Sequence, residues 1–503
     1  MQAAARRSIA DRLRVMGSPI TRRRFVRSSA AAAAAATLDV AALDPGAFAK
    51  RPDGPNILLF VIDSLRADAV YDDWVRTPNI EALARRGLRF TECFPEAMPT
   101  VPARNSILSG RRHFPFRGWY DRPGLIQAPG WQPLEHPELS FLSMLRRGGY
   151  RTSYVSDNPF LCYAPGYTRF RHSLNRFVRT GGQIGGNQPP SSVPAHILRH
   201  WLHPANDDAK TRARVALYLA NSRPWEGIDK TFAGRVFRNA LKELKDTARR
   251  PGPFALVVDT YEPHEPWTPP ARFLDRYGGW HGPEPSMPQY GRVENWLSPG
   301  LRGPVTGRMR DLYAAEVTLT DYWLGNLIER LHNLNLERET IIVLASDHGV
   351  MLGEHGWTGK VQTALYPSLT RVPLIIVHPE RRRAGDASDY FASTHDLAPT
   401  LLRMASVRRP ERMNGVDLSR AFRGGKLPER DYAWGGYSDS FFIRSRRWML
   451  WGYNRPGNFR LFDLRRDPGM NHNLAGSHPG KVHELLGKLI DRAGGRLPWY
   501  GGE

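Results

Sequence analysis

The chain has 503 residues, of which 41% are hydrophobic and 24% are charged. These values are ordinary for a globular protein, and they exclude a disordered chain, a coiled coil and a disulfide scaffold. No apolar run approaches about 18 residues, which excludes a polytopic membrane protein. The net charge is +22, and almost all of the basic residues are arginines. A basic surface attracts nucleic acid, membranes or anionic substrates. No nucleic-acid motif is present, and an Arg-rich coding composition is the simpler explanation of the charge.

The first 49 residues have the order of an export signal. Residues 21–27 (TRRRFVR) resemble the twin-arginine core, an Ala-rich stretch follows, and Ala47-Phe48-Ala49 is a small-x-small site that a signal peptidase could cut. A disordered basic tail is the alternative. We expect export to the periplasm or the medium by the twin-arginine route, and no integral membrane segment after removal of the signal.

Beyond this signal, apolar runs alternate with amphipathic segments. Continuous apolar runs predict strands buried on both faces; they occur at 56–63, 254–259, 341–347 and 372–377, with a weaker one at 151–156. Helices are predicted at 80–86, 309–331 and around 230–249. The alternation predicts an α/β fold with a mostly parallel central sheet covered on both faces. We place the catalytic α/β domain at 50–408 and a small α+β subdomain at 409–503.

Three acids stand at the ends of predicted strands: Asp63, Asp259 and Asp347. Ligands of open α/β sheets bind beyond the carboxyl ends of the strands, so these acids converge there. One such Asp is usually a turn former, but three, with His348 adjacent to the last, indicate a metal site. Oxygen-rich ligation favours one Ca²⁺, with Mn²⁺ or Zn²⁺ as alternatives. A second ion between Asp259, His264 and His395 is the alternative arrangement.

Four separated segments carry reactive side chains: 63–66, 100–110, 259–264 and 346–360. A divalent ion, a hydroxyl at a helix start and the cation of Arg104 are what ester hydrolysis at phosphorus or sulfur requires. The two cysteines, Cys93 and Cys162, form at most one disulfide and say little about the cellular compartment.

By the order of these motifs along the chain, the protein resembles the sulfatases of the alkaline-phosphatase superfamily over nearly all of residues 55–480. The matching landmarks are 56–63, 77–87, Pro263-His264, 347–349, 353–356, 371–376, 394–400 and 461–468. The resemblance implies an alkaline-phosphatase-like three-layer sandwich and an ester hydrolase. It implies that Asp63, Thr100, Asp347 and His348 hold the metal, and that Thr100, Arg104, His264 and Lys360 are catalytic.

The chain departs from the family pattern at the nucleophile. The downstream residues Pro102, Arg104 and Gly110 put Thr100 in the position of the Cys that sulfatases oxidise to formylglycine. Thr cannot be converted, so no formylglycine is expected, and Cys93 lacks the accompanying Arg. In addition, Ser64 replaces the usual second acid, and residues 156–158 (Ser-Asp-Asn) lie where the family has Gly-Lys-x-His.

This substitution bears on the reaction. A sulfated formylglycine hydrate expels sulfate by breaking its own C–O bond, whereas a sulfated Thr needs water to attack sulfur. A phosphorylated Thr is cleared by water at phosphorus, so chemistry favours phosphorus while the resemblance favours sulfate. We predict a sulfatase-family, metal-dependent hydrolase of small sulfate or phosphate esters. The alternatives are a phosphodiesterase or phosphonate monoester hydrolase, a phospho-alcohol transferase and a non-catalytic relative. The organic group and the oligomeric state are left open.

Overall fold

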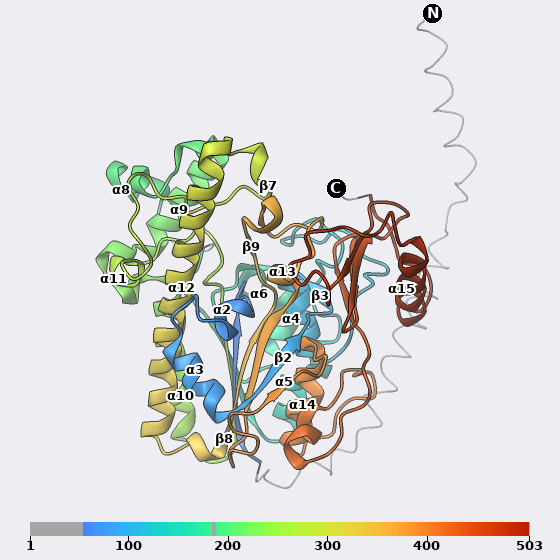
Figure 1. Cartoon of the computed structure of the whole chain (residues 1–503). Coiled ribbons are helices and arrows are strands. Elements are labelled where there is room, and N and C mark those ends of the chain that lie inside the picture. The colour runs from blue at the N-terminus through green and yellow to red at the C-terminus, as the bar shows by residue number, and fades with distance from the viewer. Residues whose placement is uncertain (1–53, 184–187, 502–503) are drawn as a thin grey trace, which may run out of the picture. The chain divides into compact units, whose positions relative to one another are not determined.

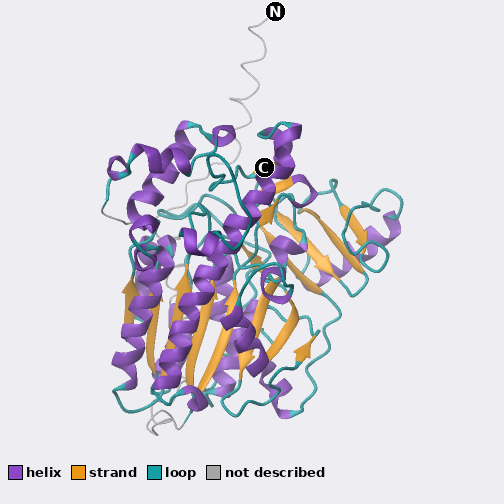
Figure 2. Ribbon diagram, turned by 60° about the vertical axis from the view of Figure 1, so that its left-hand side comes forward, coloured by secondary structure: helices purple, strands orange, loops and turns teal. Residues whose placement is uncertain are grey.

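The computed structural model describes residues 54–183 and 188–501, so the predicted export signal at 1–49 lies outside the described residues. Its centre is an eight-stranded sheet in the order β12-β2-β11-β8-β1-β6-β4-β5 (Figures 1 and 2). These strands are β1 Asn56–Ile62, β2 Leu88–Cys93, β4 Arg151–Ser156, β5 Arg176–Arg179, β6 Phe254–Thr260, β8 Thr340–Ser346, β11 Val372–Val377 and β12 Ala387–Ser388.

The middle of the sheet is parallel, as predicted. Strands β8, β1, β6, β4 and β5 pair in parallel, and all five predicted strands form. Strand β11 differs, because it runs antiparallel to both β8 and β2. Its apolar run reports burial on both faces, which is the same for either direction, so the run alone could not give the direction of the strand.

Helices cover both faces of this sheet and produce the predicted three-layer sandwich (Figure 2). On one face, α3 (Pro78–Arg86), α10 (Phe232–Ala248) and α12 (Pro299–Asn333) share a core with Leu58, Phe60 and Ile62 of β1. On the other face, α4 (Thr100–Ser109), α5 (Phe141–Arg147) and α14 (Leu397–Met404) pack with Ile57, Leu59 and Val61. The alternation of side chains along a strand thus divides β1 between two cores.

Helix α12 begins ten residues earlier than its amphipathic pattern predicts, and Pro304 lies inside it. The other helices are α2 Asp68–Tyr71, α6 Pro159–Tyr163, α7 Thr168–His172, α8 Ala195–His200, α9 Ala209–Ser222, α11 Ala271–Leu274, α13 Pro367–Thr370 and α15 Pro479–Arg492. Among the residues that the structure describes, no helix combines the length and the apolar character needed to cross a membrane.

The C-terminal part contains a five-stranded sheet in the order β16-β15-β14-β13-β3. Its strands are β3 Ala97–Met98, β13 Ala433–Tyr437, β14 Ser440–Arg444, β15 Trp448–Tyr453 and β16 Arg460–Asp463, and α15 packs against them. A small sheet joins β7 Gly291–Arg292, β10 Trp357–Gly359 and β9 Met351–Leu352. Strand β3, directly before α4, pairs in parallel with β13. The domain boundary between residues 408 and 409 stays a prediction.

Candidate active site

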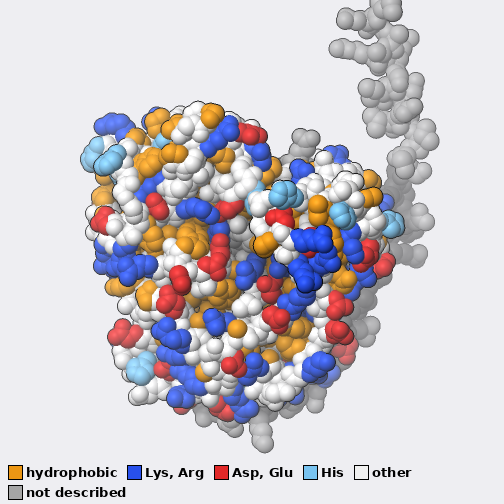
Figure 3. Space-filling model, in the orientation of Figure 1, with side chains coloured by type: hydrophobic (Ala, Val, Ile, Leu, Met, Phe, Trp, Pro, Cys, Tyr) orange, Lys and Arg blue, Asp and Glu red, His pale blue; other side chains and the backbone are white. Residues whose placement is uncertain are grey.

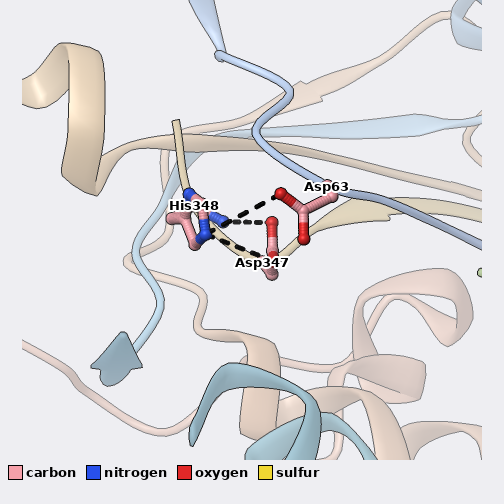
Figure 4. A group of neighbouring side chains, drawn as sticks. All are labelled: Asp63, Asp347 and His348. Carbon is pink, nitrogen blue, oxygen red and sulfur yellow. Dashed lines mark hydrogen bonds and ion pairs between the residues drawn. The ribbon is translucent and has the colours of Figure 1, made fainter. Parts of the chain in front are cut away.

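Two of the strand-end acids meet at the carboxyl edge of the sheet. Asp63 follows β1 and Asp347 follows β8, and these neighbouring strands pair up to Ile62 and Ser346. Asp63, Asp347 and His348 are completely buried, and one candidate ligand atom from each lies within 4.8 Å of the others. Figure 4 shows the three side chains turned toward one another. The carboxylate and imidazole groups predicted as metal ligands are therefore brought together.

The electrostatics of this cluster fit a divalent cation. Burial raises the pKa of Asp63, and the adjacent Asp347 raises it further. Burial also acts to raise the pKa of Asp347, but His348 and Arg104 lower that pKa below its usual range. Asp63 Oδ2 is buried and, although 3.1 Å from Arg104 Nη1, accepts no hydrogen bond from the described residues. A hard or borderline divalent cation would stabilise these two adjacent carboxylates and could bind the oxygen that accepts no hydrogen bond.

His348 is held as a neutral imidazole, the form that can bind a metal ion. Burial lowers the pKa of its imidazole. Its Nδ1 lies 2.8 Å from the carbonyl oxygen of Gly349 and donates to it, so Nε2 carries the free lone pair. That Nε2 faces the cluster, 3.4 Å from Asp347 Oδ2 and 4.0 Å from Asp63 Oδ1.

Thr100 is the first residue of α4 and is buried beside this cluster. Its Oγ1 lies 3.4 Å from His348 Nε2. Every side chain of α4 is buried, and the helix ends at Gly110, whose φ of +63° is the left-handed conformation that closes a helix. Because the helix N-terminus carries a partial positive charge, it favours an oxyanion at Thr100. The position fits the predicted nucleophile.

Arg104 lies one helical turn beyond Thr100 and contacts all three strand-end acids. Its Nη1 is 3.1 Å from Asp63 and 2.5 Å from Asp347, while its Nη2 is 2.6 Å from Asp259 on β6. Its Nε donates to both oxygens of Asp259, at 3.0 and 3.1 Å. The guanidinium plane is thereby fixed on one side by Asp259 and on the other by the two metal-ligand candidates.

Among the described residues, Asp259 lies outside the group of candidate metal ligands. Its carboxylate also accepts hydrogen bonds from Tyr154 Oη at 2.8 Å and Ser156 Oγ at 3.2 Å. The alternative second ion is not supported: within residues 54–183 and 188–501, no group of three ligands joins Asp259 to His264 and His395. Sequence reasoning missed the role of Asp259 as the partner of Arg104, because no pattern in the chain links the two residues.

The two remaining predicted residues, His264 and Lys360, meet at Glu265. His264 stacks on Tyr261, with ring centroids 4.2 Å apart, and burial lowers its pKa well below the usual value. Lys360 Nζ donates to both oxygens of Glu265, at 2.7 and 2.8 Å. Burial acts to raise the pKa of Glu265, but His264 and Lys360 lower it to about 2. Glu265 was not predicted as part of the site, although its place directly after His264, between Pro263 and Pro266, was a signal.

The departures from the family pattern also have structural positions. Ser64, in the left-handed region at φ 60°, donates from Oγ to Asp63 at 2.8 Å and from its backbone N–H to Asp347 at 3.0 Å. It therefore orients both ligand candidates without adding a charge. Cys93 and Cys162 are free and buried, and burial raises the pKa of both thiols, which disfavours either as a nucleophile.

Comparisons with known proteins agree with this geometry. The sulfatase family matches residues 55–407, and the family described as N-sulphoglucosamine sulphohydrolase, C-terminal, matches residues 353–492. An arylsulfatase of Clostridium perfringens is 25% identical, covering 89% of this chain and 96% of that protein. A choline-sulfatase of Rhizobium meliloti is 27% identical, covering 86% and 84%.

Solved structures show the same fold. A phosphonate monoester hydrolase from Silicibacter pomeroyi superimposes with a TM-score of 0.65 at 21% identity, covering 87% of this chain and 95% of that one. A structure in complex with its substrate D-glucosamine-2-N,6-O-disulfate gives a TM-score of 0.64 at 20% identity, covering 88% and 97%.

Proposed function

This chain belongs to the sulfatase family, and from that premise we propose that it hydrolyses small anionic sulfate or phosphate esters with one divalent metal ion and Thr100 as the nucleophile. The observation that carries the proposal is the position of Thr100 Oγ1, 3.4 Å from His348 Nε2 at the start of a buried helix that also presents Arg104. The proposed nucleophile and a cation therefore lie one helical turn apart on α4, beside the group of candidate metal ligands that follows β1 and β8.

Each residue of the site has a proposed role in the reaction. Asp63, Asp347 and His348 would hold the ion, which when bound acts as a Lewis acid and lowers the pKa of a coordinated hydroxyl. Thr100 Oγ1 gives up its proton and bonds to the phosphorus or sulfur atom while the bond to the leaving oxygen breaks, and the leaving group departs as the protonated alcohol. Arg104 stabilises the charge on the equatorial oxygens, because its guanidinium is already fixed by carboxylates and needs no reorganisation.

Lys360 and His264 are proposed to contact the ester from the opposite side. Lys360 has three N–H donors, and Glu265 accepts from it with both oxygens, so one donor is available for a substrate oxygen. Glu265 fixes the position of that ammonium. His264, whose pKa burial lowers, is neutral at pH 7 and presents a hydrogen-bonding imidazole rather than a charge.

Thr100 affects whether sulfur or phosphorus is the atom attacked. A threonine ester of sulfate or phosphate has no hydroxyl on the ester carbon with which to expel the group. Water must therefore break the S–O or P–O bond, which is the easier step at phosphorus. The phosphonate monoester hydrolases among the structural neighbours support this second candidate function.

Substitution of Thr100 tests the proposal. Purified enzyme is assayed on an aryl sulfate, a phosphate monoester, a phosphodiester and a phosphonate monoester, each with Ca²⁺, Mn²⁺ and Zn²⁺. Loss of a nucleophile costs several orders of magnitude in rate, so Thr100→Ala should abolish turnover and Thr100→Ser should keep part of it. Thr320→Ala is the matched control, since Thr320 is buried and its hydroxyl donates to the carbonyl oxygen of Glu316 in its own helix.

Two readouts make the test decisive. Mass spectrometry after rapid quenching should find a sulfuryl or phosphoryl group on Thr100. Thr100→Cys rebuilds the Cys-x-Pro-x-Arg pattern, and a host with a formylglycine-generating enzyme should convert it and raise sulfate over phosphate hydrolysis. Near-normal activity of Thr100→Ala on the best substrate would refute the assignment.

The remaining proposals concern the ion and the location. Two carboxylates with a single imidazole favour Ca²⁺, with Mn²⁺ or Zn²⁺ as alternatives. The twin-arginine pattern at 21–27 and the site at 47–49 support export to the periplasm or the medium.

A further inference from the structure

An arginine-lined cavity lies away from the catalytic residues. It has a volume of about 580 Å³ and opens between α14 and the 3₁₀ helix Leu418–Arg423. Five of its lining residues are arginines and one is an acid: Arg403, Arg408, Arg409, Arg420, Arg423 and Asp417. Its volume is typical of a small-molecule pocket, and its lining carries a large excess of positive charge.

The five arginines are not neutralised by the protein. All are exposed, and none forms an ion pair with a residue in the described part of the chain; Arg409 donates only to the carbonyl oxygen of Gly415, at 3.4 Å. Nearby arginines behave differently: Arg430 pairs with Asp396 at 2.7 Å and Arg381 with Glu337 at 2.5 Å. Figure 3 likewise shows basic side chains interleaved with acidic ones over the visible face.

The position of the cavity separates it from the active site. An adjoining groove shares Ser419 and Arg423 with it and is also lined by Gly54 and Pro55, which directly precede β1. The metal-ligand candidate Asp63 follows the other end of β1. Seven residues of strand put these two ends roughly 20 Å apart. In Figure 1, α14 accordingly lies low in the molecule, toward the amino ends of the parallel strands.

We propose that this cavity, the arginine cleft, is a second binding site for an anion that carries several sulfate or phosphate groups. A guanidinium donates two parallel hydrogen bonds to a tetrahedral oxyanion, so several of them around one cavity select a ligand with several such groups. Among the described residues that line the cavity, Asp417 is the single acid beside five arginines, so a singly charged ligand leaves most of the repulsion in place. A sulfated oligosaccharide and an inorganic polyphosphate share the required chemistry.

Calorimetry on the full chain tests the cleft. The probes are a heparin tetrasaccharide, inorganic tripolyphosphate and, as the simple anion, inorganic sulfate, at constant ionic strength. The double variant Arg420→Gln/Arg423→Gln removes two charges from the cleft. Arg249→Gln/Arg250→Gln removes the same charge from exposed residues outside it. We expect the cleft variant to weaken binding of a multivalent probe by about tenfold or more, and the control by less than twofold.

The outcomes separate the ligand sources. Tight binding of the tetrasaccharide alone identifies a sulfated glycan, and tight binding of tripolyphosphate alone identifies a phosphate ligand; either supports the cleft. Equal weakening by the two double variants would show only a general charge effect and overturn it. The absence of binding would also overturn the proposal, as would stronger binding to phosphatidylglycerol vesicles than to either probe. Hydrolysis of a small aryl ester should be unchanged in the cleft variant, whatever reaction the active site performs, and its loss would overturn the separation of the two sites.

Discussion

Replacement of Asp259 by Asn tests the hydrogen-bonded frame that positions Arg104. The substitution keeps the shape of the side chain and one acceptor oxygen but removes the charge. Arg104 then keeps Asp63 and Asp347 at Nη1, while Nε and Nη2 lose a carboxylate that they contact at 2.6 to 3.1 Å. The guanidinium is free to rotate away from the substrate position, so both stability and turnover should fall.

The size of the effect follows from burial. Arg104 and Asp259 are both essentially inaccessible to solvent, and removal of one partner of a buried ion pair costs about 3–5 kcal/mol. The retained oxygen of Asn places the expected loss near the lower end. Displacement of the guanidinium also removes an oriented donor from the transition state, which costs roughly a hundredfold or more in kcat/KM. Tyr154→Phe removes one hydrogen bond to the same carboxylate and should cost about tenfold or less.

Kinetics, thermal unfolding and elemental analysis should be measured on the same preparations. Because Asp259 bonds Arg104 rather than joining the metal cluster, Asp259→Asn should keep its metal ion, whereas Asp347→Asn should lose it. The reasoning is refuted if Asp259→Asn loses metal as Asp347→Asn does, which would make Asp259 a ligand. It is also refuted if kcat/KM falls no further than in Tyr154→Phe.

Three further predictions concern the ion, pH and export. The wild-type protein purified without chelator should contain one divalent ion and Asp347→Asn none; equal contents would contradict the ligand assignment. Burial raises the pKa of Asp157 from 3.8 to about 8, so the stability from its bound proton is full below about pH 4 and is lost as the pH rises through 8. The melting temperature of Asp157→Asn should therefore fall less between pH 6 and pH 9 than that of the wild type. An equal fall would argue against a protonated Asp157. Arg22→Lys with Arg23→Lys should leave the precursor inside the cell; unchanged export would refute the twin-arginine route.

Helices and strands could be predicted from the sequence where their buried residues form a local run or a regular spacing of apolar residues. Apolar runs located five strands of the central sheet but not β2, β5 or β12. Parallel pairing explains why Asp63 and Asp347 meet, since adjacent strands end together at Ile62 and Ser346. Helix α9 was not predicted, because Lys, Thr and Arg interrupt its first half and its buried residues are concentrated in its second half. Local periodicity was too weak there to distinguish a helix from a loop.

Long-range pairings were out of reach for a different reason. The contacts of Asp259 with Arg104 and of Glu265 with Lys360 join residues far apart in the chain. Each pairing satisfies a buried charge, and a buried charge is recognisable only when burial is known. The sequence therefore indicated which residue types the site contains, but not which of them neutralise one another.

The pairing of β3 with β13 governs when the active site can be completed during synthesis. Ala97 and Met98, directly before the helix that bears Thr100, pair with Gly436 and Tyr437, and the Tyr437 hydroxyl donates to the Lys360 carbonyl oxygen at 3.2 Å. The ribosome must therefore release nearly the whole chain before these contacts form. A fragment that ends before residue 433 cannot make them, so shortening from the C-terminus is expected to displace the helix that bears Thr100 rather than remove only an accessory part.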